Sequence, residues 1–375
     1  IGFFYIQKVM TEINKLYQLY LKCNQNICID SRSDKIKNSI FFGIKGEKFD
    51  GNIFIKQAIE KGAQFAVSDN KNYIDNSKII YVKDTLKALQ ELSKLHRKNI
   101  SIPIIAITGT NGKTTTKELV NHILSTTFST CSTKGNFNNH IGVPLTLLSL
   151  KKTHQIGVVE LGANHPGEID FLCSIAQPTH GIITNIGKAH LEGFGNFKNI
   201  ISTKGELYDY LKKQNGLIFI NNHDKLLIDL LDKYKKIKEY CAQEYSNTNK
   251  NKSNVLNFTC DPFIKIIWEK KSIETKIIGN YNSYNIAAAI TIAKYFKIND
   301  KNIYNSLKKL ELKNNRSEFI QTKKNQIILD AYNANPTSTT CAIKNFINIK
   351  NNTYPHRLII LGDMLELGNK ENQYH

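Results

Sequence analysis

A glycine-rich turn between an apolar strand-like run and a helix-compatible segment is the part of the sequence best suited to chemistry. The run Ile104–Thr108 leads into Gly109-Thr110-Asn111-Gly112, and Lys113-Thr114-Thr115 follows directly. In such a loop the glycines let backbone N–H groups approach phosphates, the lysine reaches the outer phosphates, and the first threonine hydroxyl can ligate Mg²⁺. Ile107 stands where the general pattern has its first glycine, so this is a shortened phosphate-binding loop. A chance Gly-Lys-Thr turn is the alternative, but the strand–loop–helix order favours nucleotide binding.

Three further polar residues follow predicted strands or lie on a predicted helix. Glu160 lies at the carboxyl end of a strand over Ile156–Leu161, where an α/β sheet commonly faces its ligand, so it is a candidate magnesium ligand. A solvated loop carboxylate is the alternative. His190 follows a strand over Gly181–Asn185, and Lys204 is one of 47 lysines. Read alone, both are more simply solvated side chains.

Asn282 and Asn285 open a helix rich in small residues. Asparagine amides present both a donor and an acceptor, as an adenine edge requires, and a spacing of three places both on one helix face. Capping of the helix by Asn282 is a compatible alternative. Further along, Asp330 ends a predicted strand before a loop closed by proline, a pattern that is weak by itself.

The elements around these residues alternate between strands and helices. Residues 1–98 form a first unit, and recurring strand–loop–helix segments over 99–313 predict a parallel sheet with helices on both faces. Residues 314–375 start a third unit, with strands over Gln326–Asp330 and Arg357–Leu361 flanking a helix from about Thr337. Two strands and one helix bury too little for a complete domain, so this unit is expected to be partial. The predicted fold class is therefore α/β, with three domains.

Composition limits the class of protein. The 375 residues are 41% hydrophobic, and no apolar run approaches the roughly 20 residues of a membrane span, which predicts a globular protein without membrane insertion. Seven cysteines without a Cys-x-x-Cys pair predict reduced thiols and hence a cytoplasmic protein, rather than disulfides or a zinc site. The net charge of +19 raises a nucleic-acid alternative, but only 4 of the 51 basic residues are arginine, the residue that base recognition favours. Anionic small substrates are the expected partners.

Several runs of the sequence, in the same order, resemble the Mur ligase family over almost the whole chain. They are the shortened loop Gly109–Thr114, Glu160–Asn164, Ala189–Gly195, Gly279–Asn285, Asp330–Pro336 and Leu361–Gly368. The resemblance implies a central ATP-binding domain, an N-terminal domain for a UDP-sugar and a Rossmann-like C-terminal domain. It also implies an ATP-dependent ligase of peptidoglycan synthesis, and hence of cell-wall biogenesis, cell shape and cell division. The branch it is most similar to joins D-alanyl-D-alanine to UDP-N-acetylmuramoyl-tripeptide through an acyl phosphate.

The resemblance assigns roles to individual residues around ATP and Mg²⁺, with two magnesium ions expected. Lys113, His190 and Lys204 become the catalytic set, with Lys204 carbamylated and held with His190 at the second metal. Thr114 and Glu160 bind the first metal. Nucleotide contacts are expected from Gly109, Thr110, Asn111, Gly112, Thr115, Asn282, Asn285, Arg316 and Asp330. Tyr281 and Ala331 depart from the family pattern, which often has histidine and serine there, and asparagines precede Arg316 where the family often has a small residue.

The resemblance also covers the UDP-sugar side. Asp30-Ser31-Arg32 and the run Gly43–Gly51 are similar to the family's uridine pocket, and Gly135–Pro144 to its loop near the sugar diphosphate. The expected substrate contacts are Ser31, Arg32, Lys45, Asp50, Asn138 and Asn139. Leu361–Gly368 is expected near the incoming amine.

Two alternatives remain open at this point. One is a Mur-type ligase that adds a single amino acid. The other is a truncated nucleotide-binding module without ligase activity, since the family's C-terminal domain normally continues past His375. A monomer is expected in each case.

Overall fold

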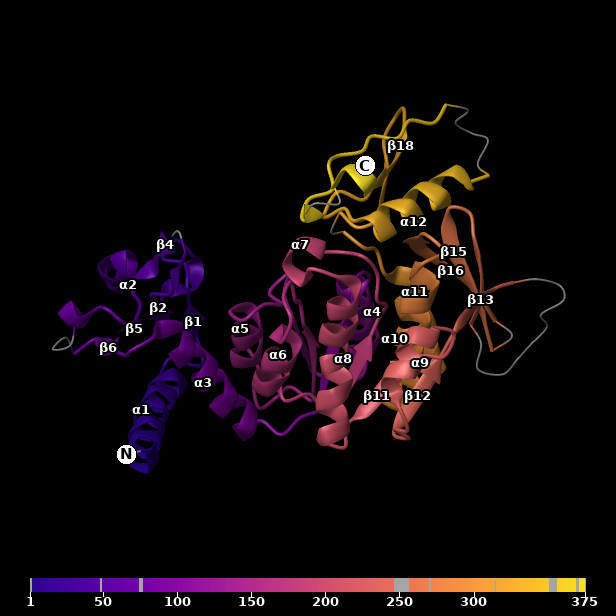
Figure 1. The fold of residues 1–375 in the computed structure, drawn as a ribbon. Coiled ribbons are helices and arrows are strands. Elements are labelled where there is room, and N and C mark those ends of the chain that lie inside the picture. Colours follow the sequence, from indigo (N-terminus) through magenta and orange to yellow (C-terminus); the bar gives the residue numbers. More distant parts are fainter. Residues whose placement is uncertain are drawn as a thin grey trace. The chain divides into compact units, whose positions relative to one another are not determined.

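The computed structural model of the chain describes residues 2–47, 49–73, 77–245, 256–269, 271–313, 315–350, 356–368 and 371–374. The chain forms two compact units (Figure 1). Unit 1 contains residues 1–102, 136–154 and 174–177, and unit 2 contains residues 103–135, 155–173 and 178–375. The predicted domain boundaries after residues 98 and 313 stay predictions, and residue 314 itself lies outside the described residues.

Unit 1 is built on a small parallel sheet with the strand order β1-β2-β5-β6. Its strands are β1 (Ile27–Cys28), β2 (Ile40–Phe42), β5 (Phe65–Ser68) and β6 (Ile79–Tyr81). Successive residues of β2 are buried on opposite faces, because Ile40 and Phe42 join one apolar cluster and Phe41 joins another. A parallel sheet covered on both faces needs apolar residues at every strand position, which is what the sequence supplies here.

Helices of unit 1 come from two separate parts of the sequence. The long helices are α1 (Gly2–Lys22) and α3 (Thr85–Asn99), and α5 (Gly142–Leu148) joins them. Tyr20 on α1 donates a hydrogen bond to the carbonyl of Leu148 at 2.6 Å, and a ring nitrogen of His96 on α3 lies 2.9 Å from the carbonyl of Leu150. The segment around α5 is therefore fixed to unit 1. The shorter elements of the unit are η1 (Asp34–Ile36), β3 (Lys45–Gly46), β4 (Phe49–Asp50), η2 (Gly51–Phe54), α2 (Ile55–Glu60) and η3 (Lys71–Tyr73).

Unit 2 contains a parallel sheet with the order β12-β11-β10-β7-β9-β8. Its strands are β7 (Ile104–Thr108), β8 (Thr130–Ser132), β9 (Ile156–Glu160), β10 (His180–Ile183), β11 (Leu217–Asn221) and β12 (Ile237–Tyr240). After β7 the chain builds β8 and β9 on one side and then β10 to β12 on the other. The order of strands therefore reverses at β7, and such a point at the carboxyl ends of the strands is where open α/β sheets bind ligands.

Helices cover both faces of this sheet (Figure 1). On one face, α4 (Lys113–Leu124) and α10 (Asn282–Tyr295) pack with Ile105, Ile107 and Ile182 in a single apolar cluster. On the other face, leucines of α8 (Phe197–Lys213) lie against Gly181 of β10, where an added Cβ would come within 2.6 Å of a leucine methyl. The remaining helices of the region are α6 (Glu168–Ala176), α7 (Leu191–Phe194), α9 (Lys225–Leu231) and α11 (Asp300–Lys309).

A second, mixed sheet of unit 2 was not predicted from the sequence. It has the order β13-β14-β15-β16, with β13 and β14 parallel and the other pairs antiparallel. Its strands are β13 (Ala242–Glu244), β14 (Leu256–Cys260), β15 (Phe263–Trp268) and β16 (Lys271–Ile278). Buried residues of these strands join the same cluster as α10, which explains why α10 carries small and apolar residues all round.

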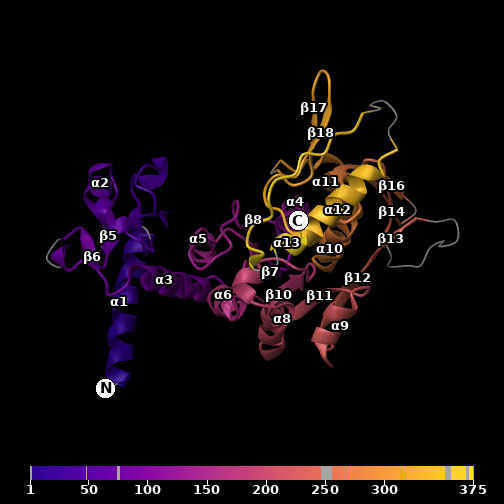
Figure 2. The ribbon, with the colours of Figure 1, turned by 45° about the horizontal axis from the view of Figure 1, so that its top comes forward.

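The C-terminal part of unit 2 contains an antiparallel hairpin and a capped helix. The hairpin, seen edge-on in Figure 2, pairs β17 (Glu318–Gln321) with β18 (Gln326–Leu329). Asn335 caps α12 (Pro336–Ile347) through a capping box with Ser338, and α13 (Glu371–Tyr374) follows later. The strand predicted over Arg357–Leu361 is wrong, since no strand pairs with this segment among the described residues and Ile360 is 86% exposed.

Candidate active site

The turn after β7 is held in one conformation by residues that follow β10. Gly109 and Gly112 have φ angles of 139° and 78°. An added Cβ would lie 2.1 Å from the hydroxyl of Thr184 at the first and 2.8 Å from the amide oxygen of Asn285 at the second. Only glycine satisfies both the backbone angle and the space at these positions.

Backbone groups of the loop are tied to the neighbouring loop. The N–H of Thr110 donates to the carbonyl of Asn185 at 2.9 Å, and the N–H of Asn111 donates to the Asn185 side chain at 3.0 Å. The hydroxyl of Thr184 donates to the carbonyl of Asn111 at 2.6 Å. These hydrogen bonds hold the loop in one conformation, with the N–H groups of Thr110 and Asn111 donating to Asn185.

Lys113 folds back over this loop. Its Nζ donates to the carbonyls of Gly109 at 2.8 Å and of Thr110 at 2.9 Å. Burial lowers the pKa of Lys113, the charge of Glu160 opposes the shift, and the charge of Arg316 adds to it. These two groups are therefore within electrostatic range of the loop lysine.

Thr114 and Glu160 are candidate ligands for a cation beside this lysine. The hydroxyl of Thr114 is buried and makes no hydrogen bond to any residue that the structure describes. Glu160 ends β9, is 1% exposed, and lies directly beside Ile107 in the strand register. A buried hydroxyl and a buried carboxylate are both oxygen ligands of the kind that Mg²⁺ prefers. Thr115, predicted to contact nucleotide, is buried in the first turn of α4.

Lys204 on α8 is buried within electrostatic range of Lys113. It is 3% exposed, its Nζ donates to the carbonyl of Ala163 at 3.3 Å, and it lies 5.4 Å from the centre of the Phe194 ring. Burial, together with the charge of Lys113, lowers the pKa of Lys204 to about 7 against the opposing charges of Glu168 and Glu206. An amine with this pKa is largely neutral at cellular pH and is therefore nucleophilic.

His190 lies directly before α7, within electrostatic range of the lysines Lys113 and Lys204. Its pKa is lowered by burial, against the effect of the Glu366 carboxylate, with further lowering by Lys113 and Lys204. The structure thus brings Lys113, His190 and Lys204 together from three separate elements. Within the described ranges no cluster of three or more His, Cys, Asp or Glu side chains could hold a metal, so these residues would need a carbamate or a phosphate to complete a site.

Asn282 and Asn285 lie in the first turn of α10, and the Asn285 amide lies against Gly112 of the glycine-rich loop. Asn285 donates to the Asn282 amide oxygen at 2.8 Å and accepts from the Thr116 hydroxyl at 3.1 Å. Asn282 donates to the carbonyl of Ile278. The N-cap position belongs to Tyr281, so the alternative of a cap by Asn282 is wrong. The predicted adenine contact of the two amides stays a prediction.

Arg316 lies at a strained turn that leads into the C-terminal part. Asn315 and Ser317 on either side have φ angles of 55° and 54°, a left-handed region that asparagine tolerates well. The guanidinium carbon lies 3.8 Å from the centre of the Tyr332 ring, and the Ser317 hydroxyl lies 2.5 Å from that of Tyr281. Two of the departures from the family pattern, Asn315 and Tyr281, therefore contribute to the turn that carries Arg316.

Asp330 lies beside the same turn. Its carboxylate accepts from the N–H of Ser317 at 3.3 Å, and burial raises its pKa against this hydrogen bond and the charge of Arg316. The structure thus groups Asp330 with Arg316, and Arg316 with Lys113.

Sequence reasoning missed two contacts between the loop region and the C-terminal part. The side chain of Asn335 donates to the amide oxygen of Asn111 at 2.7 Å. The carboxylate of Glu366 pairs with Nδ1 of His190. The Asn-Pro signal for a helix cap could have singled out Asn335, but nothing in the local pattern indicates Glu366.

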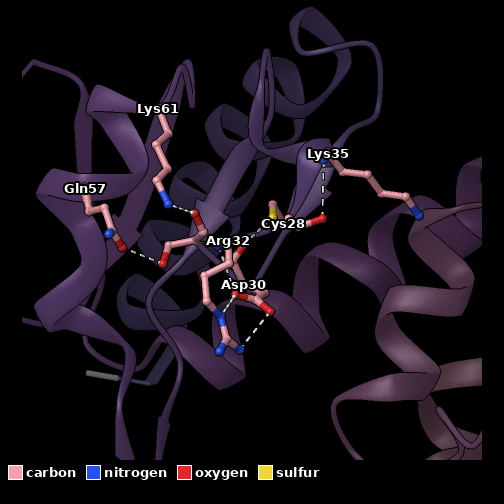
Figure 3. Close-up of polar contacts among 8 residues, drawn as sticks. Cys28, Asp30, Arg32, Lys35, Gln57 and Lys61 are labelled. Carbon is pink, nitrogen blue, oxygen red and sulfur yellow. Dashed lines mark hydrogen bonds and ion pairs between the residues drawn. The ribbon is translucent and has the colours of Figure 1, made fainter.

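The predicted UDP-sugar residues all lie in unit 1. Arg32 forms a two-point pair with Asp30 at 3.0 and 3.1 Å, and Figure 3 shows it folded back against that carboxylate. Lys61 donates to the carbonyl of Ser31 at 3.1 Å, and the Ser31 hydroxyl donates to Gln57 at 2.8 Å, so both partners hold the same turn (Figure 3). This turn is a formed polar feature of the surface.

The other four candidates lie on two separate structures of unit 1. Lys45 and Asp50 are opposite each other in the β3–β4 pair, and Asp50 caps η2 by accepting from the N–H of Asn52 at 2.9 Å. Asn138 and Asn139 precede α5, and the Asn139 amide oxygen accepts from the N–H of Gly142 at 2.9 Å. The loop that carries these two asparagines thus belongs to unit 1 although its sequence lies in the middle of the chain.

The fold and the site together define a nucleotide-binding α/β protein with a shortened phosphate loop at the point where its strand order reverses. Comparison with known families gives three matches in chain order. Residues 25–104 match the Mur ligase family catalytic domain, residues 107–293 the Mur ligase middle domain, and residues 315–375 the Mur ligase glutamate ligase domain. The chain belongs to the Mur ligase family of ATP-dependent ligases, which confirms the resemblance seen in the sequence.

Individual relatives agree on one member of this family. The chain is 36% identical to UDP-N-acetylmuramoyl-tripeptide–D-alanyl-D-alanine ligase of Bacillus subtilis over 90% of its own length and 73% of the relative's. It is 35% identical to the enzyme of the same name from Haemophilus influenzae, over 94% and 76%.

Solved structures that resemble this chain include members of the same family. A crystal structure of MurF from Acinetobacter baumannii matches with a TM-score of 0.80 at 32% identity, over 93% of this chain and 76% of that one. MurF ligase of Thermotoga maritima in complex with ADP matches with a TM-score of 0.75 at 25% identity, over 93% and 80%. The predicted α/β Mur ligase architecture is confirmed.

Proposed function

We propose that this chain joins D-alanyl-D-alanine to UDP-N-acetylmuramoyl-tripeptide with ATP, as the named relatives do, in peptidoglycan precursor synthesis. The observation that carries the proposal is the identity of 36% and 35% to relatives of this name over nine-tenths of the chain, and the glycine-rich loop that Lys113 closes supports it. The ADP-bound relative supports ATP as the nucleotide.

The reaction asks the protein mainly to bind, orient and neutralise charge. The γ-phosphoryl group passes from ATP to the terminal carboxylate of the tripeptide, and the amine of the dipeptide then displaces phosphate from the acyl phosphate. The glycine-rich loop over residues 109–112 and the Lys113 ammonium would bind the phosphates. Arg316 would add a second cation, in keeping with its influence on Lys113. Asn282, Asn285 and Asp330 would hold the nucleoside.

Two Mg²⁺ ions fit the residues present. Thr114 and Glu160 would hold one, and His190 with a carbamate on Lys204 would help to hold the other. Bound Mg²⁺ neutralises the charge that spreads over the phosphoryl oxygens during transfer. The buried hydroxyl of Thr114 and the lowered pKa of Lys204 are the observations that support these assignments.

The setting of the reaction follows from the same reasoning. Ser31, Arg32, Lys45, Asp50, Asn138 and Asn139 would bind the UDP-sugar. We expect the enzyme to act as a monomer in the cytoplasm, without nucleic acid. None of the described helices is long and apolar enough to cross a membrane.

The test is release of phosphate from ATP with UDP-N-acetylmuramoyl-tripeptide present, with and without D-alanyl-D-alanine. Release that depends on the dipeptide, with a matching gain in mass of the nucleotide sugar, is the expected result. Equal release with a single amino acid in place of the dipeptide would favour another Mur-type ligase. ATP turnover without any amide product would contradict the proposal.

A further inference from the structure

The turn that carries His190 is held at two points by a single distant residue. The imidazole Nδ1 of His190 pairs with the carboxylate of Glu366. The backbone N–H of Glu192 donates to the carbonyl of the same Glu366 at 3.2 Å. Glu366 has a φ of 63° and His190 a φ of 51°, so both residues adopt the left-handed conformation that only a few per cent of non-glycine residues adopt. Two strained backbone positions that meet in this way indicate a specific contact.

The segment around Glu366 is anchored by its neighbours. Met364 and Leu367 are buried at 7% and 3% exposure, whereas Leu365 between them is 72% exposed. A Cβ added at Gly368 would lie 3.6 Å from Cα of Glu192. The segment therefore lies against the start of α7 along several residues, and Glu366 is not a freely rotating surface side chain.

The chemistry of the pair fixes which ring nitrogen carries the proton. An ionised carboxylate only accepts hydrogen bonds, so Nδ1 of His190 must donate and must carry hydrogen. Nε2 then keeps its lone pair, and a neutral imidazole with a free lone pair is the form that binds a metal ion. Removing a carboxylate that orients a metal-binding histidine in this way typically lowers metal affinity by about 10- to 100-fold.

We propose that Glu366 is a positioning residue for the ligase reaction, which holds His190 as its Nδ1–H tautomer and so presents Nε2 to a divalent cation. The inference rests on the proposed function, because the cation role of His190 is part of it. His190 lies in the part that matches the middle domain and Glu366 in the part that matches the glutamate ligase domain. The orientation of His190 as a cation ligand therefore depends on the contact with Glu366 in the C-terminal segment.

The experiment compares Glu366→Ala, Glu366→Gln and Glu366→Asp with Glu371→Gln as a matched control. Glu371 is an exposed acid of the same C-terminal region on α13, so its replacement removes the same charge elsewhere. Two properties are measured on the full chain. The first is the ¹⁵N spectrum of the histidine rings without metal, with His190→Asn to assign the signal. The second is ligase rate against Mg²⁺ concentration.

We expect the loss of the Glu366 carboxylate to change both the tautomer of His190 and the dependence of the ligase rate on Mg²⁺. The wild type and Glu371→Gln show Nδ1–H at His190, and Glu366→Ala shows the Nε2–H form that free imidazole prefers. The Mg²⁺ concentration for half-maximal rate rises by about tenfold or more in Glu366→Ala, with a smaller loss of rate at saturating Mg²⁺, and Glu366→Asp recovers part of both.

Two results would overturn the proposal. One is an Nε2–H tautomer in the wild type, and the other is a tautomer and Mg²⁺ dependence that Glu366→Ala leaves unchanged. Should Glu366→Ala fail to fold by circular dichroism, the isosteric Glu366→Gln decides, since an amide no longer requires Nδ1 to donate. An inactive wild type would count against the proposed function, while the ring spectrum would still decide the role of Glu366.

Discussion

Replacing Lys204 tests whether this buried amine becomes an anion. Carbamylation requires a neutral amine to attack carbon dioxide. With its pKa at about 7, Lys204 is about 90% neutral at pH 8, whereas an ordinary lysine with a pKa of about 10.4 is about 0.4% neutral. The neutral form of Lys204 that carbamylation needs is therefore about 200 times as populated at pH 8 as that of an ordinary lysine.

The assay combines labelling with kinetics. Protein at pH 8 in ¹³C-bicarbonate is expected to give one carbamate carbon signal, which Lys204→Met removes. Lys204→Arg and Lys204→Met should both lose about 100-fold or more of the ligase rate, because an uncarbamylated side chain cannot bind a cation. Lys212→Met on the same helix is the control, since Lys212 is bonded to the carbonyl of Leu230 away from the site.

Three outcomes would refute the reasoning about Lys204. They are a carbamate signal that persists in Lys204→Met, no signal in the wild type at pH 8, and a Lys204→Arg enzyme with the wild-type rate. The last of these would show that a fixed cation suffices at this position.

Three further predictions concern the phosphate loop and the sheet. Thr114→Ala should raise the Mg²⁺ requirement about 10- to 100-fold in the ligase assay, whereas Thr114→Ser should keep it near the wild-type value, and equal behaviour of the two would contradict the ligand role. Gly109→Ala should abolish ATP binding in calorimetry, because its Cβ would lie 2.1 Å from the Thr184 hydroxyl; wild-type affinity would show that the loop adapts. Burial and the charge of Lys236 lower the pKa of His180 to about 4 in the folded chain. As the pH falls below about 6.5, His180 therefore binds a proton in the unfolded chain before it does so in the folded chain. Denaturant unfolding should show about 3 kcal/mol of stability lost between pH 6.5 and 4, with less loss in His180→Phe.

The elements around the site follow from local sequence. Strands predicted over Ile156–Leu161 and Gly181–Asn185 were found as Ile156–Glu160 and His180–Ile183. β-branched runs that end in glycine-rich or polar loops carry their own signal, because a buried parallel strand needs apolar residues on both faces. The phosphate loop was predictable for the same reason, since its chemistry is contained in a few consecutive residues.

The parts that could not be predicted depend on distant partners. His190 and Glu366 are 176 positions apart, and no periodic pattern links them. The mixed sheet did have a local signal, since Ile264 and Ile266 alternate with exposed or half-exposed residues on β15, but this alternation covers only two buried positions of the strand. The strand predicted at Arg357–Leu361 had the right composition, but a strand forms only where another strand pairs with it.

The attachment of α5 to unit 1 has a consequence for how the chain is made. Tyr20 and His96 are synthesised early, whereas their carbonyl partners Leu148 and Leu150 emerge about 50 or more residues after His96. The N-terminal unit therefore cannot complete its core on the ribosome until the phosphate loop has already been translated. A fragment cut after residue 98 should for the same reason expose the apolar surface that α5 covers, so isolating unit 1 for study would require grafting residues 136–154 onto it.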